Sequence, residues 1–417
     1  MKKVVKKIAL LLLVFGIGVG VTLLYMNNKY KVYEEEEPKQ IKKHVDTISM
    51  MLETEAGSGN YEMTTASSWP TEGYVFNSEL SVCENGGELS WDDENKRVLM
   101  SGNVSDKCYV YFDIKPQVLL ADYVKSLYTG TQGENSIYYH DSSLTNGAGD
   151  SSYRYSGANP NNYVCFGTNT TPCPTDNLYR IIGVFGNNVK LIKYDYATSA
   201  LLGTDGDYAS TGTPNASYYK GSLTTINTYY WNNSTKKNTW SESLLNKTNL
   251  NTNFINNIGT EWANKIATTT WKVGGNTYAN IRDVIPATAY QNEIVNPVTT
   301  NTTDNATEYS AKIGLMYVSD YGFGADPSAW TTTLYNYDGS VNGSTIRSLN
   351  WMHMGYYDWT ISRSAGNSGS AFFVSNGGSV SHSHVSGNYA VRPSFNLESS
   401  ITYVSGSGSA SDPMVIN

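Results

Sequence analysis

Apolar and polar positions alternate along the last part of the chain. Strands are predicted where this alternation or a short apolar run occurs, over residues 359–363, 371–374, 379–385 and 389–395. Asn376 and Gly377 lie between two of these runs, and an Asn-Gly pair supplies the positive φ angles that a two-residue hairpin turn needs. The pattern therefore predicts two or three antiparallel strands at the end of a β-rich domain.

The same reasoning predicts strands earlier in the chain. A three-strand meander is expected over residues 162–166, 178–185 and 189–194, with a tight turn at residues 186–188. The continuous apolar run of residues 311–319 predicts a buried strand. A strand over residues 413–416 is expected to pair near the start of the domain, so that both ends of the domain meet in one sheet.

Helical spacing of apolar residues occurs in few segments. Ile41, Val45, Ile48 and Leu52 recur at helical intervals, which predicts a short amphipathic helix that residues 57–59 end. A second helix is expected over residues 116–128, and two short helices between about 241 and 267. Residues 129–161 are rich in glycine and serine, which indicates a long loop or a linker.

The N-terminal segment has the pattern of a membrane anchor. Residues 8–26 carry no charge, and at 1.5 Å per residue a helix of this length spans about 28 Å, roughly the thickness of a bilayer core. Four lysines precede this run, which favours a cytoplasmic N-terminus and an extracytoplasmic C-terminal part. A cleaved signal peptide is the alternative. It is disfavoured because residues 25–30 offer no small-x-small cleavage site.

Four cysteines suggest two disulfides. Cys83 and Cys108 flank the central hairpin of a strand-rich stretch over residues 73–113, and Cys165 and Cys173 close a short loop. Of the three possible pairings, the sequential one needs the least chain rearrangement. An exported chain with an even number of cysteines favours disulfides. A zinc site is the alternative, but no closely spaced CxxC or CxxH pair is present.

Composition supports an α+β, β-rich fold. The 417 residues include 33 Tyr and 37 Gly, and only 16% are charged. From residue 151 onward we count 15 Lys and Arg against 16 Asp and Glu, so most of the net charge of −8 lies before that point. The larger part of the chain therefore lacks the basic surface that a nucleic-acid partner requires.

The predicted organisation has six parts. They are a cytoplasmic basic tail (1–7), a transmembrane signal anchor (8–26), a juxtamembrane segment with the short amphipathic helix (27–72), a small disulfide-linked β module (73–113), a helix and linker (114–161), and a large domain (162–417). This organisation predicts a single-pass protein of the cell membrane whose C-terminal domain lies outside the cytoplasm.

A series of motifs in the large domain resembles a family of uncharacterised bacterial surface domains. The motifs are Tyr179-Arg-Ile-Ile-Gly183, Trp240-x-x-Ser-x-Leu245, Leu250-Asn-x-x-Phe254, Ile313-Gly-Leu-Met-Tyr-Val-Ser319, Trp359-Thr-Ile-Ser-Arg363 and Ala390-Val-Arg-Pro-Ser-Phe395. That family is similar to the C-type lectin fold, as used by formylglycine-generating enzymes and by hypervariable receptor proteins of diversity-generating retroelements. The module at residues 81–113 also resembles a short cysteine-bearing unit that is found beside such domains in anaerobic Gram-positive bacteria. The resemblance implies a C-type lectin-like domain but supplies no established activity.

The resemblance implies one exposed, ligand-binding face at the terminal hairpin. The expected residues are Ser364, Asn367, Ser368, Ser370, His382, His384, Ser386 and Asn388. Small polar groups beside aromatic rings suit an adaptable recognition surface, so the expected ligand is a glycan or a protein at the cell surface. The alternative is that these residues are ordinary turn formers on a solvated edge. Genetic diversification of this segment is a further possibility that the protein sequence leaves open.

Enzymatic and metal-dependent functions are disfavoured. Chemistry of the formylglycine-generating type needs a cysteine pair late in the fold, and no cysteine follows Cys173. His382 and His384 on one strand face offer two metal ligands, but no third is evident. The calcium-ligand motifs of sugar-binding C-type lectins are absent, and residues 293–297 resemble one only distantly. We therefore expect no catalytic residue, no metal and no cofactor.

Three residues of the C-terminal part are expected to be structural. These are Trp359, Arg363 and Arg392, of which Arg392 is expected to brace a loop through hydrogen bonds to a carboxylate or to carbonyls. Asp358 is expected to pair with Arg363 or Arg392 rather than to act with Asp320. The predicted function is an adhesin- or receptor-type binding protein, and a structural envelope protein without a ligand is the alternative.

Overall fold

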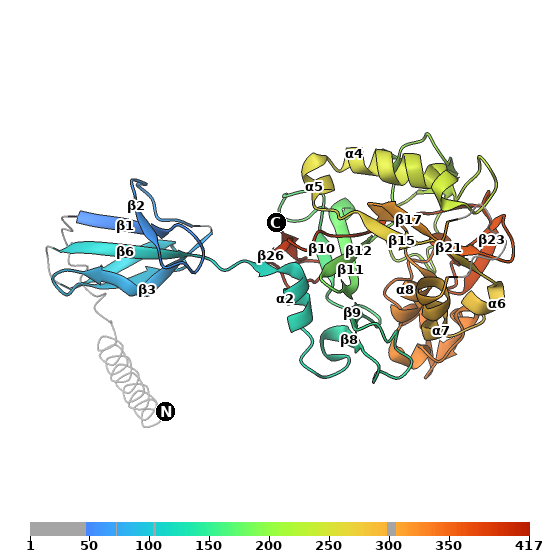
Figure 1. The fold of residues 1–417 in the computed structure, drawn as a ribbon, viewed down its shortest axis with the longest axis horizontal. Coiled ribbons are helices and arrows are strands. Elements are labelled where there is room, and N and C mark those ends of the chain that lie inside the picture. Colours follow the sequence, from blue (N-terminus) through green and yellow to red (C-terminus); the bar gives the residue numbers. More distant parts are fainter. Residues whose placement is uncertain (1–46, 72, 103–105, 298–305) are drawn as a thin grey trace, which may run out of the picture. The chain divides into compact units, whose positions relative to one another are not determined.

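The computed structural model describes residues 47–71, 73–102, 106–297 and 306–417, and it divides into two compact units, Met1–Pro116 and Gln117–Asn417 (Figure 1). The fold is strand-rich, as expected. The predicted basic tail and transmembrane anchor lie outside the described residues. Within the described part of the chain, no helix is long and apolar enough to cross a membrane.

The first unit is built on a sheet with the strand order β2-β1-β6-β3, to which the hairpin β4-β5 is added. Its strands are β1 (Thr47–Glu53), β2 (Tyr61–Thr64), β3 (Tyr74–Cys83), β4 (Glu88–Asp92), β5 (Arg97–Ser101) and β6 (Lys107–Ile114). Met50, Val110 and Phe112 form its buried core. The Cys83–Cys108 disulfide joins β3 to β6, which confirms the predicted pairing.

The amphipathic helix that was predicted to end at residues 57–59 is wrong over the residues that can be compared. Residues 41–46 lie outside the described part of the chain, and Thr47–Glu53 form β1, which pairs with β6 in parallel and with β2 in the antiparallel sense. Ile48, Met50 and Leu52 also recur at every second position, which is the period of a strand. Pairing with two neighbouring strands provides hydrogen-bond partners for the backbone of β1 on both sides. These tertiary contacts therefore favour the strand period over the helical period.

The main sheet of the second unit has the order β18-β25-β12-β11-β9-β8, with β10 also paired to β11. Its strands are β8 (Ile137–His140), β9 (Ser152–Tyr155), β10 (Tyr163–Cys165), β11 (Leu178–Phe185), β12 (Asn188–Lys193), β18 (Ile313–Gly314) and β25 (Ser394–Asn396). The predicted meander of β10, β11 and β12 is confirmed. The predicted Cys165–Cys173 disulfide is also present.

The prediction of a loop or linker over residues 129–161 is wrong for β8 and β9. These strands pair with each other, and β9 pairs with β11, so the segment is part of the main sheet. Glycine and serine predict turns here correctly, but the short runs between them are tyrosine-rich, and tyrosine favours strands.

Further strands form smaller sheets in the second unit. The sheet β16-β21-β22-β23 contains β16 (Gly275–Asn276), β21 (Asp358–Ser364), β22 (Ser370–Val374) and β23 (Val380–His384), which confirms the pairing of the terminal hairpin. The predicted two-residue Asn-Gly turn is wrong, because residues 375–379 connect β22 to β23 and the positive φ lies at Gly378. The remaining strands are β13 (Tyr208–Gly212), β14 (Ile226–Tyr230), β24 (Asn388–Tyr389), β15 (Thr269–Lys272), β17 (Glu308–Ala311), β19 (Ser340–Val341) and β20 (Ser344–Thr345). The single strand expected over residues 389–395 is also wrong, because this segment divides between β24 and β25, which belong to other sheets.

Both ends of the second unit meet in one sheet, as predicted. Strand β26 (Thr402–Ser405) pairs with β27 (Val415–Ile416) on one side and with β7 (Val118–Leu119) on the other. Met414 also forms a bridge with Val164 beside β10. The last strand therefore ties the C-terminal end of the unit to its beginning.

The helices of the second unit are short. The α-helices are α2 (Leu120–Ser126), α3 (Ser199–Leu202), α4 (Ile255–Asn257), α5 (Thr260–Asn264), α6 (Tyr278–Ile281), α7 (Pro286–Tyr290) and α8 (Val318–Phe323). Two π-helical segments are η4 (Leu245–Phe254) and η5 (Gln291–Val295). Single 3₁₀ turns are η1 (Glu134–Ser136), η2 (Thr175–Asn177), η3 (Trp240–Glu242), η6 (Pro327–Ala329), η7 (Leu334–Asn336) and η8 (Ile346–Ser348). Helical structure is thus present at the two places where the sequence predicts it in the second unit, residues 116–128 and 241–267.

The buried strand expected over residues 311–319 is correct in its burial and wrong in its length. The run from Ile313 to Tyr321 is buried, but only Ile313 and Gly314 belong to a strand, and α8 begins at Val318. Asp320 accepts a hydrogen bond from the backbone N–H of Tyr317 at 2.9 Å, which satisfies an orphan donor at the start of α8. This turn places Asp320 inside the unit, where the candidate site is built.

Candidate functional site

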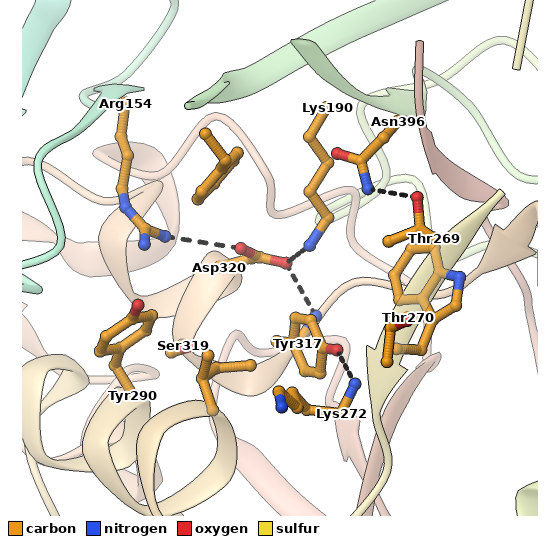
Figure 2. Close-up of a pocket in the computed structure, with 13 residues that line it drawn as sticks. Arg154, Lys190, Thr269, Thr270, Lys272, Tyr290, Tyr317, Ser319, Asp320 and Asn396 are labelled. Carbon is orange, nitrogen blue, oxygen red and sulfur yellow. Dashed lines mark hydrogen bonds and ion pairs between the residues drawn. The ribbon is translucent and has the colours of Figure 1, made fainter. Parts of the chain in front are cut away.

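A cleft of about 220 Å³ opens on the second unit (Figure 2). Strands β9, β12, β15 and β25, the end of β11, helix α7, segment η5 and the start of α8 supply its walls. The lining residues are Arg154, Phe185, Lys190, Thr269, Thr270, Trp271, Lys272, Tyr290, Ile294, Tyr317, Ser319, Asp320 and Asn396. Aromatic rings and polar groups therefore face the same space.

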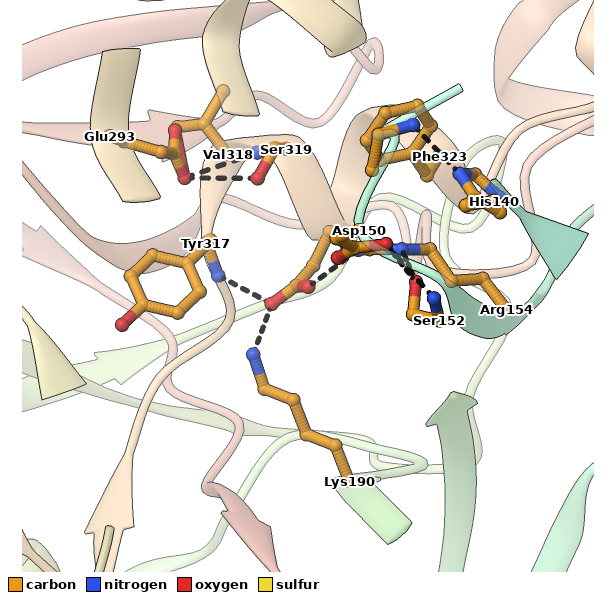
Figure 3. A network of polar contacts seen from close by, with 12 residues as sticks. His140, Asp150, Ser152, Arg154, Lys190, Glu293, Tyr317, Val318, Ser319 and Phe323 are labelled. Carbon is orange, nitrogen blue, oxygen red and sulfur yellow. Dashed lines mark hydrogen bonds and ion pairs between the residues drawn. The ribbon is translucent and has the colours of Figure 1, made fainter. Parts of the chain in front are cut away.

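The floor of the cleft is a buried chain of charges. Lys190 Nζ lies 2.5 Å from Asp320 Oδ2, and Arg154 NH1 lies 3.6 Å from Asp320 Oδ1. Arg154 NH2 in turn donates to Asp150 Oδ2 at 2.6 Å (Figure 3). Two cations and two carboxylates alternate in this chain, so its formal charges cancel.

Three separate elements position this network. Lys190 follows Val189 on β12 at the centre of the main sheet, Arg154 lies on β9, and Asp320 lies in the first turn of α8. The side chains of Lys190, Arg154 and Asp320 are each 6% exposed or less. Burial is the largest influence on the Lys190 ammonium group and lowers its pKa, although Asp320 opposes that shift.

Aromatic rings surround both cations. Lys190 Nζ lies 4.5 Å from the ring centre of Tyr317 and 5.4 Å from that of Trp271. The Arg154 guanidinium lies 4.6 Å from the ring of Phe185 and 5.2 Å from that of Tyr290. Cation–π attraction at these distances stabilises charge that has lost its water.

The mouth of the cleft lies along β15. Thr270 is exposed there, and Thr269 accepts a hydrogen bond from Asn396 Nδ2 at 3.1 Å. The backbone N–H of Lys272 donates to the Tyr317 hydroxyl at 2.7 Å, and the Lys272 side chain pairs with Glu308 on β17. These contacts hold polar groups in fixed positions at the entrance.

Glu293 lies directly behind this cleft. Its Oε1 accepts hydrogen bonds from the Ser319 backbone N–H and hydroxyl, both at 3.3 Å (Figure 3). The Ser362 hydroxyl also donates to this oxygen, at 3.2 Å. Its Oε2 has no partner among the described residues. Burial, with a smaller contribution from the nearby Asp320, raises the pKa of Glu293 to about 8 although the hydrogen bonds from Ser319 and Ser362 oppose the shift. Glu293 therefore keeps its proton at neutral pH.

The predicted binding residues do not share one exposed face. Asn367, Ser368, His384 and Asn388 are exposed, and His382 and Ser386 are half-buried. Ser364 and Ser370 are buried, 0% and 4% exposed, because they lie on β21 and β22 inside the sheet. The expectation of exposure is thus wrong for these two residues.

The two strand histidines also behave differently. The His382 ring stacks on Tyr278 with ring centres 3.5 Å apart, whereas His384 Nδ1 lies 2.7 Å from the Ser386 hydroxyl. Asn388 donates from Nδ2 to Ser210 Oγ at 3.2 Å. Among the described residues, neither histidine belongs to a group of three potential metal ligands.

The three residues expected to be structural lie in the interior. Trp359 and Arg363 are each 1% exposed, and Arg392 is 3% exposed. Arg392 donates to Asp358 Oδ2 at 2.7 Å and to the Met352 carbonyl at 2.6 Å, a carboxylate and a carbonyl as the sequence predicts. Arg363 donates from Nε to the Val273 carbonyl at 2.7 Å.

The pattern of the sequence does not predict that the cleft residues form a site, although some features of the sequence point to individual residues. A lysine between Val189 and Leu191 on a strand with apolar residues on both sides is a candidate for burial, and buried lysines are rarely unpaired. Arg154 lies in the segment expected to be a linker. Asp320 directly follows the run of residues 311–319 that was expected to be a strand, so no pattern brings the three together.

Comparison of the chain with family models, with curated proteins and with solved structures finds no match. The chemistry of the cleft is therefore the basis for a functional proposal.

Proposed function

We propose that the chain is a membrane-anchored, extracytoplasmic surface protein of adhesin or receptor type, whose second unit binds a ligand in the cleft beside β15. The C-type lectin-like arrangement expected from its motifs is part of this proposal. The observation that carries the proposal is the cleft itself, in which aromatic rings and fixed polar groups converge on one concave space.

The shape of the cleft favours a small ligand group. Its volume of about 220 Å³ lies below the roughly 300–1,000 Å³ of sites for drug-sized ligands. It therefore suits one ring, such as the terminal residue of a glycan, better than a long segment of polymer. A protein ligand would insert a single side chain.

The charges of the cleft favour a neutral ligand. Asp320 and Asp150 compensate Lys190 and Arg154, and Glu308 pairs with Lys272. Trp271 and Tyr317 offer apolar rings, while Thr269, Thr270 and Asn396 offer hydroxyl and amide groups. A sugar ring has an apolar face and a polar edge, so it matches both kinds of surface.

Two disulfides agree with an oxidising compartment. Together with the N-terminal apolar run, they support display outside the cytoplasm. A structural envelope protein without a ligand is the outcome that a failed binding test would favour.

A glycan-array and host-protein binding screen of the detergent-solubilised full chain tests the proposal. Thr270→Arg places a long side chain at the mouth of the cleft, and Thr211→Arg makes the same change at an exposed position on β13 that does not line the cleft. We expect specific binding by the wild type and by Thr211→Arg, with binding lost in Thr270→Arg. No binding by the folded wild type would refute the proposal.

A further inference from the structure

A lysine amine and an aspartate carboxyl group meet in the interior of the second unit. Lys190 Nζ lies 2.5 Å from Asp320 Oδ2, and the two side chains are 6% and 3% exposed. The other lysine–carboxylate pairs among the described residues have at least one side chain that is about half exposed or more. Only the Lys190–Asp320 pair therefore combines close approach with exclusion from water in the described part of the chain.

Burial removes the hydration of the Lys190 ammonium group, which makes the uncharged amine easier to form than it is in water. Asp320 Oδ2 is the only hydrogen-bond acceptor of its Nζ atom among the described residues, and the remaining neighbours are the rings of Tyr317, Trp271 and Phe185. An ammonium ion loses hydration when it is buried, so transfer of its proton to the carboxylate becomes less costly than in water. Asp320 and Glu293 both favour the ammonium form of Lys190, but burial outweighs them, so the pKa of Lys190 is lowered.

The surroundings of Asp320 favour attack on its carboxyl carbon. The backbone N–H of Tyr317 donates to Oδ2 at 2.9 Å, and the Arg154 guanidinium lies 3.6 Å from Oδ1. Both are fixed positive groups directed at the carboxyl oxygens. Hydrogen-bond donors in such positions stabilise the tetrahedral intermediate of acyl transfer. Asp150 holds Arg154 in place from the other side.

We propose that Lys190 and Asp320 form an intramolecular amide bond, a covalent cross-link between β12 and α8. In this step Lys190 Nζ, freed of one proton, attacks Cγ of the protonated Asp320 carboxyl group. The N–C bond forms and the C–O bond to the carboxyl hydroxyl breaks. The hydroxyl keeps its own proton, takes a second proton from the nitrogen, and leaves as water. Nothing is oxidised or reduced, and no co-reactant is needed. The adjoining cleft gives the water molecule a path out.

The position of the bond would give it a mechanical role. It would join residues 130 positions apart in the sequence and so close a long loop of the chain around the sheet. A covalent closure of this length restricts the unfolded chain strongly, and a surface protein that is pulled or attacked by proteases gains resistance from it. The inference does not depend on the ligand proposed for the cleft.

Mass spectrometry of the full chain tests the proposal. The folded wild type should be lighter than its sequence mass by one water, about 18 Da, after reduction of both disulfides. Trypsin should fail to cleave after Lys190, and a branched peptide should join the segments that contain Lys190 and Asp320. Asp320→Ala and Lys190→Met should restore the full mass.

A matched control is present on the same strand. Lys193 is also buried, but its Nζ donates to the Asp176 carbonyl at 3.0 Å and forms no ion pair with a carboxylate of the described residues. Lys193→Met should therefore keep the loss of water. Full mass together with cleavage after Lys190 in the folded wild type would overturn the proposal, and so would a loss of about 18 Da without a branched peptide, since dehydration elsewhere would explain it. Both readouts on the wild type decide the matter even where a variant fails to fold.

Discussion

Replacement of Glu293 by glutamine should remove a pH dependence of stability from the second unit. Glu293 is 2% exposed, and its pKa rises from the ordinary 4.5 to about 8 in the folded protein. A carboxyl group with a raised pKa binds its proton more tightly in the folded state than in the unfolded state. Its stabilising effect is therefore complete below pH 4.5 and is lost as the pH rises to about 8.

The size of this effect follows from the shift. Each pKa unit corresponds to about 1.36 kcal/mol, so an increase from pH 5 to pH 8 should cost the wild type about 3–4 kcal/mol through this group. The glutamine side chain in the Glu293→Gln variant does not ionise and can keep an oxygen acceptor for Ser319 and Ser362. The variant should match the wild type near pH 5 and become about 3–4 kcal/mol more stable by pH 8.

Urea unfolding at several pH values between 5 and 8.5 measures this difference. Tryptophan fluorescence reports mainly on the second unit, because only Trp69 and Trp91 lie in the first. Other titrating groups, such as buried Asp358 with a pKa raised to about 6 by desolvation, contribute equally to both proteins and cancel in the difference. A difference that stays constant over this pH range would refute the burial of an uncharged Glu293 behind the cleft.

Three other variants have expected outcomes that equilibrium unfolding can check. Arg392→Ala should lower stability by about 3–5 kcal/mol, because it leaves the Asp358 carboxylate buried without its partner; an unchanged melting temperature would contradict this. Gly183→Ala should cost about 1–3 kcal/mol, since its Cβ would lie 2.4 Å from the Tyr153 carbonyl and force β9 away from β11; wild-type stability would show that the strands are not so close. Replacement of both Cys83 and Cys108 by serine should destabilise the first unit by about 3 kcal/mol without affecting the second, measured by circular dichroism and tryptophan fluorescence.

Local pattern was sufficient where an element's neighbours in space are also its neighbours in sequence. The meander of β10, β11 and β12 and the hairpin of β22 and β23 were predicted because strands that follow each other closely in the sequence pair with each other. Each of these pairings is decided within about twenty residues.

Long-range pairing limited the prediction elsewhere. Strand β1 pairs in parallel with β6, about sixty residues later, and its apolar residues satisfy a helical as well as a strand period. Strands β8 and β9 are short and lie between glycine-rich turns, so only the pairing of β9 with β11 and of β8 with β9 shows that they belong to the main sheet. The cleft was not predictable for the same reason, because Arg154, Lys190 and Asp320 come from three distant segments.

The predicted terminal face shows a related limit. Serine and asparagine mark turns and solvated edges, and they also occur in buried strands where the backbone supplies partners. Ser370 lies inside the sheet on the same strand as Phe372, although a serine in a segment rich in glycine and serine suggests a surface position.

The most direct test of the central proposal is a titration of a ligand found by array against three forms of the full chain. The wild type, Thr270→Arg and a triple variant with Asn367, His382 and His384 changed to alanine would be compared by isothermal calorimetry. We expect Thr270→Arg to weaken binding at least about tenfold, or by about 1.4 kcal/mol, and the triple variant to bind like the wild type. Binding that survives in Thr270→Arg and is lost in the triple variant would contradict the cleft as the site and assign the ligand to the terminal hairpin.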